Sequence, residues 1–129
     1  MELVVDANIL FSALIKNDYT YKKLFEQKLT LYTPQEVFTE FKKHEKELLK
    51  KTTRTTTEFY KALNILEKRL VVVPTQELIP YVEQAENITP DPDDMIYFAL
   101  ALRIGCSIWS NDKALKKQTY VHIYHTHEL

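Results

Sequence analysis

The chain has 129 residues, 45% hydrophobic and 27% charged, so we expect one globular domain over residues 1–129 and exclude global disorder. The 17 basic and 18 acidic side chains leave a net charge of −1, so any phosphate binding must come from a local patch. The single cysteine, Cys106, allows no intramolecular disulfide and favours a reducing cytoplasm. No apolar run approaches the roughly 18 residues of a membrane span, and the single Gly105 excludes glycine-rich phosphate loops.

Strands and helices are expected to alternate along the chain. Short apolar runs predict strands over residues 3–5, 29–32, 70–73, 107–109 and 120–124. Helical spacing predicts helices over residues 7–15, 21–28, 34–50, 58–69, 76–86 and 95–103, and a short helix after Asp112. Short apolar strands without polar alternation indicate a parallel sheet that is covered on both faces. The predicted fold is therefore α/β, with three α/β/α layers and a five-stranded, mainly parallel central sheet.

Two of these helices carry start signals. Thr33, Pro34 and Glu36 predict a capping box with proline at the first helical position. The run from Asp91 to Asp94 predicts a cap at Asp91, with Asp93 and Asp94 near the positive end of the helix dipole. Capping accounts for Glu36, which is not nominated as a site residue.

Four acidic residues are candidates for chemistry. Asp6 and Asp112 follow predicted strands, at the sheet edge where ligands bind in open parallel sheets. Asp6 lies between apolar residues and needs a partner, whereas a plain helix cap is the simpler interpretation of Asp112 taken alone. Asp94 lies on the apolar side of a buried helix, so it is expected to point inward. Glu40 lies beside the apolar stripe of its helix, either at the site or on a solvated flank.

Together, Asp6, Glu40, Asp94 and Asp112 could meet at one end of the sheet. Four carboxylates in one place repel each other unless a cation or protons intervene. Oxygen-only ligands suit Mg²⁺ or Mn²⁺, which activate water and stabilise charge on a phosphoryl oxygen. His122, His125 and His127 are most simply a strand edge and a tail, and a metal-binding tail is the alternative.

The ordered motifs resemble the PIN domain family, in the small single-domain ribonuclease form of the VapC-like toxin type. The resemblance covers nearly the whole chain and rests on four segments, Val4 to Leu10, Thr33 to Phe41, Asp91 to Leu102 and Trp109 to Leu115. It implies a five-stranded, largely parallel sheet, a Mg²⁺- or Mn²⁺-dependent ribonuclease and, for many small members, a toxin–antitoxin pair. Trp109 departs from the family pattern, where a smaller aliphatic residue is usual.

The resemblance also implies roles for individual residues. Asp6, Glu40, Asp94 and Asp112 match the family's acids, with Asp91 and Asp93 as further candidates. Asn8 and Ser110 match polar positions that support the acids or contact substrate.

The expected substrate is RNA in single-stranded form, because a shallow acidic site must meet an accessible backbone. Lys42, Lys43 and Lys46 follow Glu40 and are candidate RNA contacts, although a solubilising helix face explains them equally well. The resemblance also implies two partners, an antitoxin protein and a second copy of the chain in a homodimer. We expect no association with a membrane.

Three other functions are alternatives to a nuclease. The same fold without activity, as an RNA- or protein-binding module, remains the main alternative. A phosphoacceptor receiver domain needs paired acids near the first strand and a lysine after the last, which this chain lacks. A phosphatase of the haloacid dehalogenase type needs a second aspartate where Asn8 stands.

Overall fold

The fold is built on one parallel sheet. We describe a computed structural model that covers residues 1–15 and 18–129. The strands are β1 (Glu2–Val5), β2 (Thr30–Pro34), β3 (Val71–Val73), β4 (Ser107–Trp109) and β5 (Ile123–Tyr124). Their order is β3-β2-β1-β4-β5, and all four pairings are parallel. The predicted three-layer α/β fold is confirmed.

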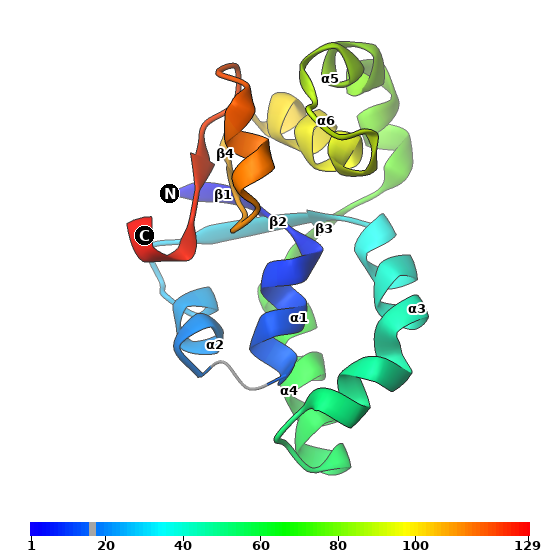
Figure 1. Cartoon of the computed structure of the whole chain (residues 1–129), viewed down its shortest axis with the longest axis vertical. Helices are drawn as coiled ribbons and strands as arrows, with labels where there is room; N and C mark the ends of the chain where they lie inside the picture. The colour runs from blue at the N-terminus through cyan, green and yellow to red at the C-terminus, as the bar shows by residue number, and fades with distance from the viewer. Residues whose placement is uncertain (16–17) are drawn as a thin grey trace.

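Two groups of helices cover the two faces of this sheet (Figure 1). One group comprises α1 (Ala7–Ile15), α2 (Asp18–Leu24), α3 (Glu36–Lys51) and α4 (Thr56–Arg69), which connect β1, β2 and β3. The other comprises α5 (Val82–Ile88) and α6 (Met95–Ile104), which precede β4. Strands β2 and β3 are added on one side of β1, and β4 and β5 on the other, so the strand order reverses at the boundary between β1 and β4. Ligands of open α/β sheets bind beyond the strand ends at such a point.

The central strands are fully buried because their residues are apolar on both sides. Leu3, Val4 and Val5 have no exposed surface, and Val5 is in register with the buried Trp109 of β4. Helix α6 packs across β1, β2 and β4 through an apolar face that includes Phe98. No helix in the described part of the chain is long and apolar enough to span a bilayer.

The predicted capping box at Thr33 is wrong. Residues Thr33 and Pro34 continue β2, where they pair with Val72 and Val73, so α3 begins only at Glu36. The α3 cap position, Gln35, makes no side-chain cap hydrogen bond. A true capping box lies instead at α4, where Thr55 accepts from the Glu58 N–H and the Glu58 carboxylate accepts from the Thr55 N–H.

Several predicted boundaries also shift. Helix α2 ends at Leu24 rather than at Lys28, and its start at Asp18 places an acid at the positive end of the helix dipole. The helix predicted over residues 76–86 divides into a 3₁₀ helix, η1 (Thr75–Tyr81), and α5, because Pro80 cannot donate a backbone hydrogen bond. The last strand is shorter than predicted, because the Gln118 side chain bonds both the N–H and the carbonyl of Val121 in a turn.

Gly105 ends α6, in the left-handed conformation at φ 77°. Nothing lies within 4 Å of a Cβ built there, so a side chain would be strained by the backbone conformation alone. Gly105→Ala should therefore lower the free energy of unfolding by about 1 kcal/mol. Urea unfolding measures this, with Thr119→Ala in an exposed turn as the control. Equal stability of the Gly105 variant and the wild type would contradict the explanation.

Candidate active site at the ends of β1 and β4

Asp6 anchors the candidate site. It follows β1 directly, and its backbone N–H donates to the Trp109 carbonyl of β4 at 3.1 Å. Its side chain is only 6% exposed. Oδ1 accepts from the Asn8 N–H at 2.8 Å, in the first turn of α1, and Oδ2 accepts from the Ser110 hydroxyl at 2.7 Å. These two bonds are the partners that a buried carboxylate requires.

Burial raises the pKa of Asp6, while the hydrogen bonds from Asn8 and Ser110 lower it and the charge of Asp112 raises it again. The net direction is upward, so the site favours a proton or a cation at this carboxylate. Ser110, which is fully buried, holds one of the two carboxylate oxygens in place.

Asp112 caps a helix and is also linked to Asp6. Its Oδ1 accepts from the Ala114 N–H at 2.9 Å, so it caps the 3₁₀ helix η3 (Lys113–Lys117), as the simpler interpretation predicts. Its own N–H donates to the Ser110 hydroxyl at 3.1 Å, which links it to Asp6 through one side chain. The charge of Asp112 raises the pKa of both Asp6 and Asp94, so capping does not remove it from the site's electrostatics.

Asp94 carries the least compensated charge. Asp91 caps the 3₁₀ helix η2 (Pro92–Asp94) as predicted, since its Oδ1 accepts from the Asp93 N–H at 2.9 Å. Asp94 occupies the cap position of α6, but its side chain makes no cap hydrogen bond. Burial, followed by the charges of Asp6, Asp91, Asp112 and Asp93, raises the pKa of Asp94 to about 6.

A cavity of about 520 Å³ brings these elements together. Asp6, Asp94 and Glu40 all line it, from β1, η2 and α3 respectively. Glu40 lies at the rim, because its side chain is 43% exposed and Lys43 Nζ is 3.5 Å from its Oε1. His44 Nε2 lies 3.7 Å from the other Glu40 oxygen.

The remaining predicted residues divide between the cavity and its surroundings. Asn8, Asp93 and Lys43 line the cavity. Ser110 and Asp112 reach it through Asp6 and through charge, without lining it. Asp91, Lys42 and Lys46 do not line it, so Lys43 is the lysine of the predicted set that lies at the acids.

The capping explanation of Glu36 is wrong. With the capping box absent, its Oε2 accepts from the Thr75 hydroxyl at 2.7 Å, and its Oε1 is buried with no hydrogen-bond partner among the described residues. Glu36 lines the same cavity as Glu40, one helical turn away. Its i, i+4 spacing to Glu40 was the signal that could have found it.

Tyr97 was also missed. Its hydroxyl oxygen accepts from the Ala7 N–H at 3.2 Å, and the tyrosine lines the cavity. Burial and the nearby acids Asp6, Asp94 and Glu40 raise the pKa of Tyr97 above its usual range, so it stays neutral. Its position in an almost wholly apolar helix made it look like ordinary core.

The acids are close enough to shift one another's pKa values, but their carboxylate oxygens are not gathered tightly around one point. Among the described residues, the one group of three whose ligand atoms all lie within 4.8 Å of one another is His125, His127 and Glu128. In that tail, Lys116 Nζ lies 2.6 Å from Glu128 Oε1 and already neutralises the carboxylate. The predicted four-carboxylate cluster is therefore looser than expected from the sequence.

This looseness fits a hydrated divalent cation. Mg²⁺ keeps several waters and binds through one or two carboxylates rather than in an all-protein cage. The donor set of the cavity is oxygen-rich, and burial together with the charges of neighbouring acids raises the pKa of Asp94. The residues present therefore suit Mg²⁺ or Mn²⁺ better than zinc.

Comparisons with known proteins agree with this fold. The sequence model of a family described as "PIN domain" matches residues 4–127. The chain is also similar in structure to a chain of VapBC2 from Rickettsia felis, whose crystal structure was determined with VapBC2 bound to a DNA fragment from their promoter. The TM-score is 0.70 at 14% identity, over 97% of this chain and 98% of that one. No curated protein matches the chain.

The raised pKa of Asp94 makes a testable statement about stability. The folded state holds this proton more tightly than the unfolded state, so ionisation costs stability as pH rises from the ordinary 3.8 through about 6. Without metal at pH 8, Asp94→Asn should be more stable than wild type by about 1–2 kcal/mol after solvent screening, and this gain should vanish near pH 4. Urea unfolding in a chelator measures both values.

Glu83→Gln, which removes an exposed acid on α5, serves as the control and should show no such gain. An Asp94→Asn variant that is less stable than wild type at pH 8 would contradict the electrostatic description.

Proposed function

The chain belongs to the PIN domain family, and from this premise we propose that it is a divalent-metal-dependent endoribonuclease that hydrolyses RNA phosphodiester bonds. The family resemblance expected from the sequence is confirmed. The observation that carries the proposal is the convergence of Asp6, Asp94 and Glu40 on one cavity, next to Asp112. Carboxylates gathered at this point of the sheet are suited to cation-assisted chemistry.

Asp6, Asp94 and Asp112 would hold Mg²⁺ or Mn²⁺, with Glu40 contributing directly or through water. When bound, such a cation lowers the pKa of water and offsets charge that develops on a phosphoryl oxygen. Glu36 lines the same cavity, and its Oε1 has no hydrogen-bond partner in the described part of the chain, so we propose it as a further acid for a hydrated ion or for positioning water.

The chain's own residues supply orientation and exclusion of solvent. Ser110 and the Asn8 N–H each hold one oxygen of Asp6, which fixes the direction of its carboxylate. Tyr97 joins α6 to the first turn of α1, so Asp94 and Asp6 are carried on elements tied to each other. A site held by such bonds loses little conformational entropy when the substrate binds.

Single-stranded RNA is the proposed substrate. The acidic cavity by itself repels a phosphate backbone, so binding needs cations at the site and near it. Lys43 lies on the rim beside Glu40, and His44 lies one residue further along α3. Lys42 and Lys46 are exposed on the same helix and are proposed as outer contacts.

The likeness to VapBC2 supports a toxin role with an antitoxin protein as partner, and we propose both for this chain. The homodimer stays a prediction. The apolar residues of α4 are the candidates for such an interface. Phe59 and Leu66 are buried in the core, Leu63 is partly buried against it, and Tyr60 is exposed. The apolar pattern of α4 is therefore mostly explained by packing.

The catalytic proposal predicts loss of RNA cleavage when the acids are neutralised. Asp6→Asn and Asp94→Asn should each lower the rate of Mg²⁺-dependent cleavage of a single-stranded RNA by about 100-fold or more, because each loses a charge that offsets the cation. A chelator should abolish wild-type cleavage, and Glu83→Gln should cleave like the wild type. Undiminished cleavage in both variants, or in the chelator, would contradict the proposal.

Absence of cleavage in the wild type, together with retained RNA or protein binding, would favour the catalytically silent module.

The basic contacts predict a change in salt dependence. Lys43→Ala should weaken RNA binding more than Lys42→Ala or Lys46→Ala, because Lys43 alone of the three lines the cavity. Each lost phosphate contact should flatten the plot of log affinity against log salt by about 0.7. Fluorescence anisotropy at several salt concentrations measures this slope. Lys61→Ala, on the exposed face of α4, is the control, and equal slopes in all variants would remove these lysines from the RNA path.

A further inference from the structure

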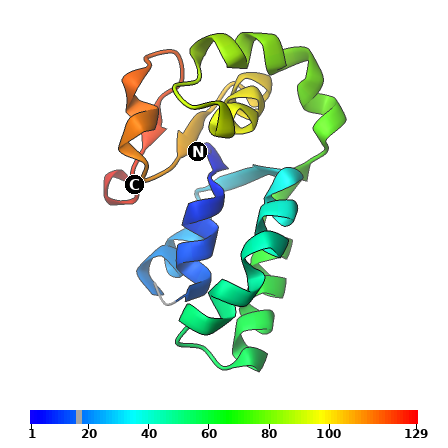
Figure 2. The same cartoon turned by 45° about the vertical axis from the view of Figure 1, so that its right-hand side comes forward.

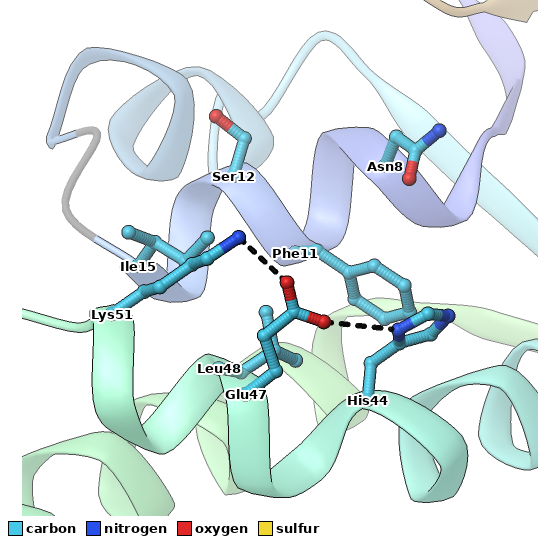
Figure 3. Close-up of a pocket in the computed structure, with 8 residues that line it drawn as sticks. All are labelled: Asn8, Phe11, Ser12, Ile15, His44, Glu47, Leu48 and Lys51. Carbon is cyan, nitrogen blue, oxygen red and sulfur yellow. Dashed lines mark hydrogen bonds and ion pairs between the residues drawn. The ribbon is translucent and has the colours of Figure 1, made fainter.

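Helices α1 and α3 pack side by side (Figure 2). A second hollow lies between them, next to the acidic cavity, and its lining residues are drawn in Figure 3. This groove measures about 470 Å³. It shares Asn8, Phe11 and His44 with the acidic cavity, so the two hollows are neighbours on the same face of α1 and α3. A chain molecule bound at the acids can therefore extend into the groove.

The groove has an aromatic and apolar floor. The rings of Phe11 and His44 lie with their centroids 5.7 Å apart and their planes tilted by 54°. Leu48, which is buried, continues this surface along α3. Flat apolar surfaces with aromatic rings bind nucleobases by stacking, whatever the base.

Polar groups line the two sides of the floor. Asn8 and Ser12, one turn apart on α1, form one side, and their amide and hydroxyl both donate and accept hydrogen bonds (Figure 3). Lys51 and Glu47 of α3 form the other side, with Lys51 Nζ 2.6 Å from Glu47 Oε1. His44 Nδ1 lies 3.6 Å from Glu47 Oε2.

Glu47 is therefore paired with Lys51, the cation that an anionic ligand would bind. The Lys51 ammonium, by hydrogen bond and charge, lowers the pKa of Glu47, so this glutamate is ionised at neutral pH. An incoming phosphate competes with Glu47 for Lys51, and removal of the glutamate charge should free the lysine.

We propose that the α1–α3 groove binds one nucleotide of the RNA chain next to the bond that is cut. The base lies against Phe11 and His44, its edge meets Asn8 and Ser12, and a phosphate pairs with Lys51. This inference rests on the proposed function. The three residues shared with the acidic cavity favour a polynucleotide, since one chain can reach both neighbouring hollows.

The test compares two variants that break one ion pair from opposite sides. Binding of a fluorescein-labelled, randomised twelve-nucleotide RNA is measured by anisotropy in Mg²⁺, in proteins that also carry Asp6→Asn. Lys51→Ala should weaken binding by about threefold or more, and Glu47→Gln should strengthen it by about twofold. Loss of the ion pair for structural reasons would move both affinities in the same direction.

Two further variants complete the design. Lys50→Ala, an exposed neighbour outside the groove, is the matched control and should leave the affinity unchanged. Ser12→Trp fills the groove and should weaken binding by about tenfold. Thermal unfolding establishes whether each variant is folded. If Ser12→Trp does not fold, Lys51→Ala and Glu47→Gln still decide the test.

Equal RNA affinity in the folded Lys51, Glu47 and Ser12 variants would overturn the proposal and leave the groove to a protein partner. The same holds if Lys51→Ala and Glu47→Gln shift affinity alike. Cleavage by proteins with Asp6 intact is assayed separately. If the protein cleaves RNA but the groove variants bind RNA like the wild type, only the groove proposal is contradicted. Absence of cleavage contradicts the proposed function.

Discussion

The hydrogen bond between Ser110 and Asp6 joins the ends of the two strands on which the site depends. It closes a buried contact between residues 104 positions apart, and β1 and β4 are neighbours in the sheet only because the chain reverses its course between them. The apolar strands place Asp6 where water is excluded, and an ionised carboxylate there requires compensation. Ser110 and the first turn of α1 supply part of it, and the rest is left for a cation or a proton.

The same constraint explains why the acids do not form a closed cage. Asp112 is committed to a helix cap, Asp94 stands uncapped at the start of α6, and Glu40 reaches in from the rim beside Lys43. Each acid is held by its own element, and the elements meet around a cavity instead of a point. Such spacing leaves room for water and for a phosphate, which a catalytic metal site needs and a purely structural site does not.

Much of this arrangement could be predicted from the sequence, because it depends on local patterns. Buried strands followed by Asp6 and Asp112 marked the edge of the sheet, and Gly105 marked the end of α6. The failures came from tertiary context. Pro34 pairs with Val73 in the sheet, which local capping rules do not foresee, and the shift freed Glu36 to line the cavity. Neither Tyr97 nor the groove beside α1 has a local signal, since both follow from how helices pack.

The central claim is that the carboxylates around Asp6 bind a divalent cation. The most direct measurement is the anomalous scattering of manganese in crystals of the wild-type protein grown with Mn²⁺. The account predicts a manganese peak in contact with Asp6 or Asp94, and its disappearance in Asp94→Asn crystals. A peak confined to the tail group of His125, His127 and Glu128, with none at the acidic cavity, would contradict it.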